Sequence, residues 1–239
     1  MATLSESPQT RVQRILGSSL LSGALGDIVP AAVFLYFAAR TSIFPIGLCL
    51  HAAKYGWDFL TVVRILATSA ATAFCITQFV MFVGRKPVRS HRSKPFDVVI
   101  ALAGAYLLAL PVWSRPPSAG AILYLGFGLN AIGSLLSTLA LLSLSSCWGL
   151  LPEARGLVTG GMYRIVRNPI YVAEEIAILG GLLVAPSWTY ASAVLLQATL
   201  QVLRARREER VLRATFPGEY ERFERKTKWR FVPGLYCYF

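Results

Sequence analysis

Long apolar runs recur along the chain and set its predicted fold. Residues 65–83 and 98–114 contain no charged side chain, and residues 119–142 contain only Asn130 as a strongly polar group. Each run is close to the roughly 20 apolar residues that an α-helix needs to cross a bilayer. Asn130 lies among glycines, so we expect it on a close-packed helix face. The pattern predicts three membrane-spanning helices here.

A further span is predicted near the start of the chain. Residues 15–39 are apolar apart from Asp27. A frame shifted to 28–52 avoids Asp27 but includes Arg40. Both frames are long enough to span, and we take 15–39 as the first span.

The last apolar region is divided by a proline. Residues 170–185 and 187–203 are two shorter apolar stretches that meet at Pro186. Because proline followed by Ser and Trp is typical of a turn, we expect a helical hairpin. The chain is therefore predicted to be an all-α, polytopic membrane helical bundle of about six spans.

Basic residues alternate with the spans. Four regions, namely the N-terminal tail 1–14 and residues 84–95, 150–169 and 204–230, hold 20 of the 24 Lys and Arg residues. Such a bias marks the cytoplasmic side of a membrane protein. It predicts cytoplasmic N- and C-termini, and the Ala-, Leu- and Arg-rich composition favours a bacterial inner membrane.

Composition excludes several other classes of protein. The chain has 239 residues, of which 55% are hydrophobic and 15% charged, with a net charge of +12. So much apolar residue excludes a disordered chain, and the long apolar runs do not fit a soluble nucleic-acid binder. The four cysteines are scattered without CxxC or Cys/His spacing, so no metal site is predicted.

The polar residues concentrate in two blocks that flank the predicted hairpin. The first block is LVTGGMYRIVRNPIYVAEEIAILG, from residue 157, and the second runs from Glu208 to Pro233. These blocks resemble the isoprenylcysteine carboxyl methyltransferase and phospholipid methyltransferase superfamily. The matching positions are Leu157, Val158, Thr159, Gly161, Tyr163, Arg164, Val166, Arg167, Pro169, Tyr171, Leu179 and Gly180, then Glu208, Glu209, Leu212, Phe216, Gly218, Glu219, Tyr220, Phe223 and Pro233.

The resemblance implies an enzyme that transfers a methyl group from S-adenosylmethionine to a lipophilic or membrane-partitioned acceptor. The acceptor could be an isoprenylcysteine-type carboxylate, a phospholipid amine or a small thiol. Loop arginines would hold the cofactor carboxylate, glycines would allow close backbone approach, and the Glu pair would bind the amino group or the ribose. The candidate cofactor-binding residues are Gly160, Gly161, Tyr163, Arg164, Pro169, Tyr171, Glu208 and Glu209.

Four further residues are catalytic candidates: Arg167, Asn168, Glu174 and Glu175. Asn168 stands where the family has histidine, and an amide cannot titrate near neutral pH. Glu174 and Glu175 lie just inside the hairpin, where ionisable groups are costly and usually functional. One of them could face the site and take a proton from an amine or thiol. The alternative is an interfacial position with Arg167 or another basic partner.

Other interpretations remain open from the sequence. The pairs Arg204–Glu208 and Glu209–Arg213 have i,i+4 spacing, so the two glutamates could be an ordinary helix-surface network. An NADPH-dependent sterol or steroid reductase, or a non-enzymatic lipid-binding scaffold, are alternative functions. The chain is predicted to divide into the N-terminal tail 1–14, four N-terminal spans in 15–151, and a methyltransferase-like region in 152–239. The basic C-terminal tail, which includes residues 204–230, is expected to bind anionic headgroups of the membrane.

Overall fold

The computed structural model describes residues 29–86, 88–89, 100, 103–104 and 119–234. Within these ranges it is all-helical, as predicted, and contains no strand. The elements are α2 (Val29–Tyr55), α3 (Phe59–Val83), α5 (Gly120–Leu144), η4 (Ser145–Cys147), η5 (Gly161–Arg164), α6 (Pro169–Val184), α7 (Trp188–Thr215) and α8 (Glu219–Lys226).

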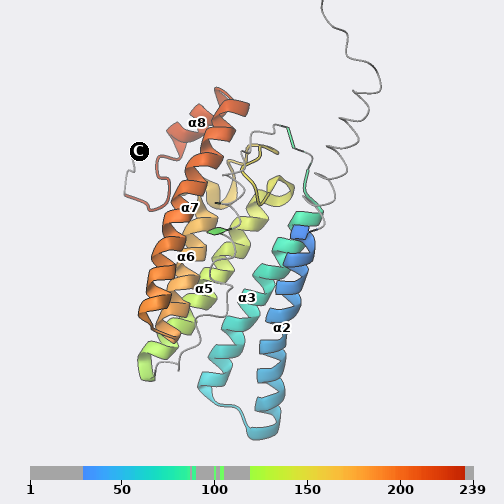
Figure 1. Cartoon of the computed structure of the whole chain (residues 1–239), viewed down its shortest axis with the longest axis vertical. Helices are drawn as coiled ribbons and strands as arrows, with labels where there is room; N and C mark the ends of the chain where they lie inside the picture. The colour runs from blue at the N-terminus through green and yellow to red at the C-terminus, as the bar shows by residue number, and fades with distance from the viewer. Residues whose placement is uncertain (1–28, 87, 90–99, 101–102, 105–118, 235–239) are drawn as a thin grey trace, which may run out of the picture.

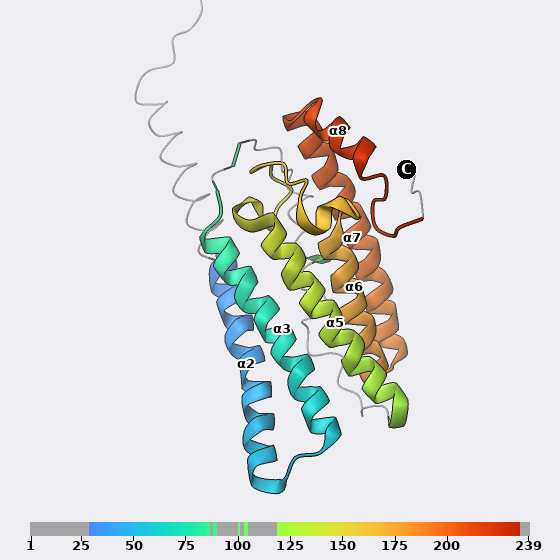
Figure 2. The same cartoon turned by 180° about the vertical axis from the view of Figure 1, so that it is seen from behind.

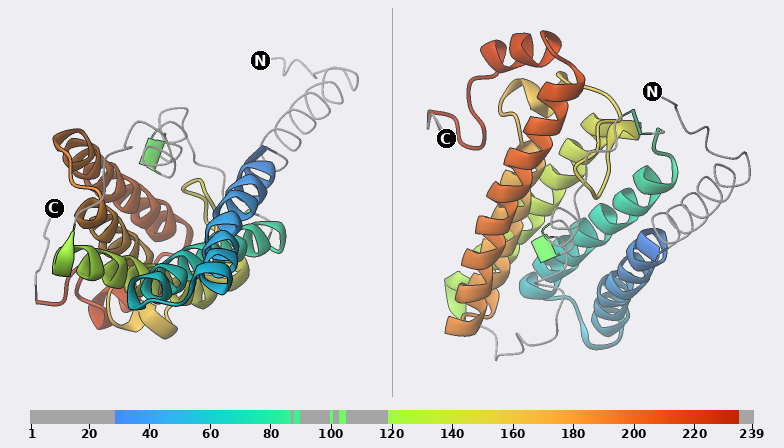
Figure 3. Two further views of the ribbon diagram at one scale, coloured as in Figure 1. Left: turned by 90° about the horizontal axis from the view of Figure 1, so that it is seen from below. Right: turned by 45° about the horizontal axis from the view of Figure 1, so that its top comes forward.

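The long helices lie side by side in chain order. Helix α2 packs on α3, α3 on α5, α5 on α6, and α6 on α7 (Figure 1). The same order is visible from behind (Figure 2). The short helix α8 lies across one end of α7 (Figure 3). This arrangement makes α5 the central helix, with the α2–α3 pair on one side and the α6–α7 hairpin on the other.

Three described helices are long and apolar enough to cross a membrane. They comprise Pro30–Tyr55, Phe59–Val83 and Gly120–Cys147. Large apolar side chains point outward from them, as a lipid environment requires; Ile43 and Phe59 are examples. The chain is therefore an integral membrane protein. The predicted span 98–114 lies almost wholly outside the described residues, so the total of six spans stays a prediction.

The predicted first span ends in the wrong place. Helix α2 continues past residue 39 to Tyr55, so the frame 28–52 is the closer one, and residues 15–28 lie outside the described part. The polar residues beyond 39 do not break the helix. The hydroxyls of Thr41 and Ser42 donate to carbonyls one turn earlier, at 2.8 Å and 2.7 Å. The chain turns only at Gly56, whose φ of +102° favours glycine.

The predicted hairpin at Pro186 is confirmed. Helix α6 ends at Val184 and α7 begins at Trp188. Ser187 caps α7, because its side-chain oxygen accepts a hydrogen bond of 3.0 Å from the Tyr190 amide. Helix α7 then continues well past residue 203 to Thr215 and includes the charged Arg204–Arg213 segment.

Small residues bring α5 and α6 into backbone contact. A Cβ on Gly126 would lie 2.9 Å from the Gly180 carbonyl oxygen, and one on Gly133 would lie 2.7 Å from the Ala177 Cα. Asn130 stands between these glycines and donates to the Ala177 carbonyl at 3.1 Å. The close-packed face expected around Asn130 is confirmed. This contact sets the position of α6, whose first turn carries the candidate site residues.

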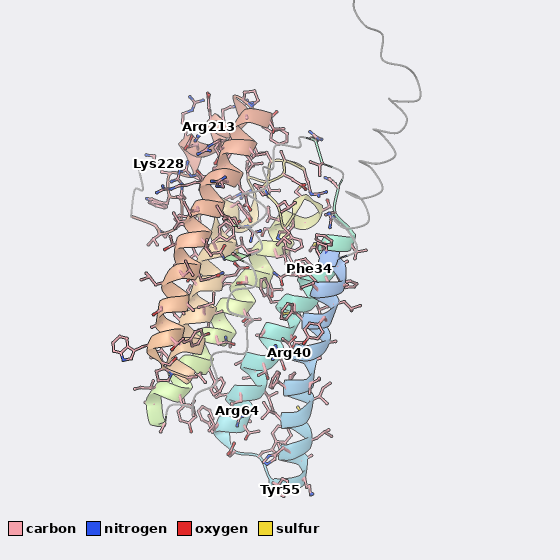
Figure 4. All side chains as sticks on the ribbon, viewed as in Figure 1. Phe34, Arg40, Tyr55, Arg64, Arg213 and Lys228 are labelled. Carbon is pink, nitrogen blue, oxygen red and sulfur yellow. The ribbon has the colours of Figure 1, made fainter. Side chains whose placement is uncertain are left out.

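The basic residues gather at one end of the bundle. In Figure 4, Arg213 and Lys228 lie at the end where α2 begins and α3 finishes, whereas Tyr55 lies at the opposite end. Arg40 and Arg64, which fall outside the four regions predicted to be cytoplasmic, lie away from the basic end. This distribution agrees with the predicted alternation, and a cytoplasmic location for the basic end remains our proposal.

The α5–α6 contact yields a test with a built-in control. Gly133→Ala would force the two backbones apart, so we expect it to destabilise the protein by about 1–3 kcal/mol. Gly128→Ala on the same helix should be neutral or stabilising, because nothing lies within 4 Å of the added Cβ. Thermal unfolding in detergent compares the two. Equal melting temperatures for both variants would contradict the packing described here.

Candidate active site

A cavity of about 330 Å³ opens among α3, α5, α6 and α7 and extends to the basic end of the bundle. The 147–158 segment and α8 contribute to its walls. Among the residues predicted for the site, the cavity is lined by Tyr163, Arg167, Asn168, Tyr171, Glu174, Glu208 and Glu209. Residues from both sequence blocks thus meet at one place.

Glu209 is the centre of a buried ionic cluster, called here the Glu209 cluster. Arg230 Nη2 lies 2.9 Å from one carboxylate oxygen of Glu209, and Arg230 Nε lies within 3.2 Å of both. Asn168 Nδ2 donates to Glu209 Oε1 at 2.8 Å, and Arg167 Nε lies 3.6 Å from the same oxygen. All four side chains are buried. The amide at position 168 therefore serves as a hydrogen-bond donor to a carboxylate.

The expected pair between Glu209 and Arg213 is not formed. Arg213 instead binds Glu224 on α8 at 2.9 Å, and Arg167 also contacts Glu224. Burial works against ionisation of Glu224, but the hydrogen bonds from the two arginines outweigh it and lower its pKa. An ordinary helix-surface role for Glu209 is thus wrong, because the carboxylate points into the protein.

Glu208 forms the second ionic contact of the cavity. Arg204 Nε donates to Glu208 at 3.1 Å, so this expected i,i+4 pair exists. The Arg204 side chain is buried, however, and its Nη2 also donates to the Leu150 carbonyl at 2.9 Å. The Arg204 guanidinium lies 5.4 Å from the centre of the Tyr171 ring. The pair therefore forms part of the cavity wall.

The two glutamates of α6 have different surroundings. Glu174 lines the cavity, and Gln201 of α7 donates to its carboxylate at 2.6 Å. Glu175 does not line the cavity, and its Oε1 is buried without a hydrogen-bond partner among the described residues. Neither pairs with Arg167. Glu174 is thus the one of the two that faces the candidate site.

The segment after α8 joins the two blocks. The amides of Arg167 and Asn168 donate to the carbonyls of Trp229 and Arg230, at 2.9 Å and 3.1 Å. The Thr227 hydroxyl donates to the Tyr163 carbonyl at 3.2 Å. These contacts hold the chain before α6 against the C-terminal segment. The sequence showed a basic and aromatic stretch here but did not indicate its partners.

Several predicted site residues do not line the cavity. Gly161 has a φ of +57°, and a Cβ there would lie 2.5 Å from the Ser143 hydroxyl, so its close approach is to α5. Gly160 has open space around it. Arg164 is exposed and faces a separate groove, and Pro169 occupies the first turn of α6. We expect none of these four to contact a ligand in the cavity.

Two further groups at the outer end of the cavity lack hydrogen-bond partners among the described residues. They are the Tyr220 hydroxyl and Arg167 Nε, both buried. Burial is also the main reason that the pKa of Tyr220 is raised, with a further contribution from Glu209. Buried polar atoms are nearly always hydrogen-bonded, so such atoms beside a cavity indicate a ligand. Tyr220 matched the second block, but no role was predicted for it from the sequence.

The cavity is acidic in a strongly basic protein. Its charged lining residues are Glu153, Glu174, Glu208, Glu209, Arg167 and Arg204. Carboxylates therefore outnumber guanidiniums, whereas the whole chain carries +12. Most of these charges are paired: the arginines contact Glu209, Glu224 and Glu208, Glu209 also binds Arg230, and Glu153 binds Arg155. Glu174 makes no ion pair among the described residues, so a positively charged group of a ligand is favoured beside it.

One family model matches the part of the chain that holds most of the cavity lining. The family model for phospholipid methyltransferase matches residues 121–219, from the first turn of α5 to the first residue of α8. No curated protein matches the chain. The matched range contains Glu174, Glu208 and Glu209 but stops before Arg230. The match confirms the resemblance that the two sequence blocks predicted, as a similarity of residues 121–219 to the phospholipid methyltransferase family.

Proposed function

We propose that the protein is a membrane methyltransferase that moves a methyl group from S-adenosylmethionine to a neutral amine of a membrane-partitioned molecule. The observation that carries this proposal is the acidic cavity between membrane helices, open toward the basic end of the bundle. A cofactor with a sulfonium and an amino group is net positive, and a neutral amine becomes an ammonium on methylation. Binding of the cofactor and methylation of the amine would therefore both place positive charge beside carboxylates.

The outer end of the cavity fits the cofactor. Arg167 and Tyr220 present atoms without hydrogen-bond partners in the described part of the chain, and an amino-acid carboxylate can accept from both. Glu208 can accept from the amino group, and Tyr171 supplies an aromatic face. When bound, S-adenosylmethionine would supply a methyl group to an in-line nucleophile, with S-adenosylhomocysteine as the leaving group. The chain's residues hold donor and acceptor in line.

The middle of the cavity supports an amine acceptor. An amine attacks through its lone pair, so it must be neutral, and the N–CH₃ bond leaves a nitrogen with a surplus proton. Glu174 is placed to accept that proton, while Gln201 holds its other oxygen. A carboxylate acceptor would instead be repelled by Glu174 and Glu208. A thiol acceptor satisfies the same charge argument and is distinguished by its product.

The two alternative functions fit the cavity less well. NADPH carries several phosphate charges, whereas the cavity lining contains four glutamates and only two arginines. A scaffold that binds lipid only through surface charge does not need buried polar atoms facing a cavity. The exposed basic residues Arg222, Arg225, Lys226 and Lys228 fit anionic headgroups on the side that we propose to be cytoplasmic.

Ligand-induced stabilisation tests the cofactor assignment. We expect S-adenosylhomocysteine to raise the melting temperature of the detergent-purified protein in a saturable way, and NADPH to leave it unchanged. Tyr220→Phe removes only a hydroxyl without a described partner, so it should weaken S-adenosylhomocysteine binding roughly threefold to tenfold. Tyr124→Phe, at a partly exposed tyrosine of α5, is the matched control. Stabilisation by NADPH alone would overturn the proposal.

The role of Glu174 can be tested against its neighbour. Glu174→Gln keeps an oxygen for Gln201 to donate to but cannot take a proton, so kcat should fall about 100-fold or more. Glu175→Gln should stay near the wild-type rate, because Glu175 does not line the cavity. The assay follows transfer of labelled methyl groups to phosphatidylethanolamine in nanodiscs. Equal rates in the two variants would show that Glu174 is not the proton acceptor.

A further inference from the structure

The groove that Arg164 faces is separate from the cavity and carries the opposite excess of charge. It has a volume of about 600 Å³, is lined mainly by α8 and the 157–164 segment, and is called here the α8 groove. Its charged lining residues are Arg164, Arg222, Lys226 and Glu219. Cations thus outnumber carboxylates, and the α8 groove favours an anionic ligand.

The three cations of the α8 groove are exposed and make no ion pair among the described residues. Arg222 Nε donates to the Gly218 carbonyl at 3.2 Å, and its terminal nitrogens have no partner in the described part of the chain. A phosphate group accepts charge-assisted hydrogen bonds from guanidinium and ammonium groups, so it fits these donors. Glutamates pair, by contrast, with Arg155, Arg167, Arg204, Arg213 and Arg230.

Apolar side chains in and beside the α8 groove favour a lipid over a soluble phosphate. Leu157 and Phe223 are part of its lining. Ile165, the neighbour of Arg164 in the chain, is 56% exposed, and Trp229 is 36% exposed. Tryptophan beside basic residues is typical of a membrane interface. A phospholipid headgroup would use both the cations and these apolar side chains, whereas a free phosphate ion would use the cations alone.

The α8 groove shares a wall with the cavity. Leu157 and Phe223 line both of them. Phe223 also packs in a buried cluster with Tyr163 and Tyr220, which line the cavity. The hydroxyl of Thr227, another residue of the groove, donates to the Tyr163 carbonyl at 3.2 Å. A ligand that fixes α8 against the 157–164 segment therefore also fixes the outer end of the cavity.

We propose that the α8 groove binds the phosphate of an anionic phospholipid, and that this binding holds α8 over the cavity and raises its affinity for the cofactor. Arg164 comes from the segment before α6, whereas Arg222 and Lys226 come from α8. These like charges repel one another in an empty groove, and an anion between them attracts both elements. The effect on affinity rests on the proposed cofactor site, because Tyr220 of α8 belongs to it. The groove itself does not depend on the proposed function.

Soluble short-chain lipids test binding to the α8 groove in detergent. We expect the wild-type protein to bind dihexanoylphosphatidylglycerol roughly tenfold more tightly than dihexanoylphosphatidylcholine, whose headgroup has no net charge. In Arg222→Gln with Lys226→Gln this ratio should fall toward one. Arg225→Gln with Lys228→Gln is the matched control, because it removes the same charge from exposed residues outside the groove. Thermal shift gives the affinities, and both empty variants should melt with the wild type.

Three results would overturn the binding site. The wild type could bind the two lipids equally well, or the two double variants could lose the preference equally. The second result would show that the preference comes only from diffuse surface charge. Inorganic phosphate that displaces dihexanoylphosphatidylglycerol at an equal concentration would show that the groove takes free phosphate and not a lipid.

Nanodiscs test the effect on the cofactor site. Adding phosphatidylglycerol to phosphatidylcholine nanodiscs should raise the affinity for S-adenosylhomocysteine roughly fivefold in the wild type and in the control variant. The groove variant should keep the affinity measured in phosphatidylcholine alone. An affinity that phosphatidylglycerol leaves unchanged in the wild type would overturn the proposed coupling.

The same samples separate this inference from the proposed function. If the lipid preference appears as expected but S-adenosylhomocysteine binds in no nanodisc, the α8 groove stands and the proposed cofactor site is wrong. If S-adenosylhomocysteine binds equally in every nanodisc and no lipid preference appears, the groove is wrong and the proposed function survives.

Discussion

The Glu209 cluster holds the candidate site together. One buried carboxylate binds Arg230 from the C-terminal segment and Asn168 from the start of α6, while sitting on α7 itself. Removing one member of such a buried network typically costs about 3–5 kcal/mol, because its partner is left charged and unpaired. The cluster therefore fixes three separate segments around the outer end of the cavity. The glycine contact between α5 and α6 fixes the inner end.

Charge is separated between the surface and the interior of this protein. The exposed arginines and lysines of α7, α8 and the C-terminal segment make the chain basic and set its predicted orientation. Carboxylates outnumber arginines in the cavity lining, and Glu174 is the lining carboxylate without an ion pair in the described part of the chain. A basic exterior attracts a headgroup surface, and an acidic interior favours a positive ligand. The two properties support one account, in which a lipid-partitioned amine is methylated at the membrane surface.

The sequence predicted the local features well and the long-range pairs poorly. Apolar runs, the turn at Pro186 and the glycine face around Asn130 depend on neighbouring residues, so the local sequence is enough to predict each of them. Arg230 and Asn168 lie 62 residues apart, and Gln201 and Glu174 lie 27 apart. No periodicity links positions so distant. The first span ends at Tyr55 and not at residue 39 as predicted. The hydroxyls of Thr41 and Ser42 are satisfied within their own helix, which hydropathy alone does not reveal.

Identification of the methylated atom tests the central claim most directly. The purified protein is incubated with methyl-labelled S-adenosylmethionine and nanodiscs of bacterial total lipid, and labelled lipids are identified by mass spectrometry and by their stability in mild base. An amine acceptor held beside Glu174 predicts a base-stable N-methyl product. Label that mild base releases as methanol would show a carboxylate acceptor, and that result would contradict the account.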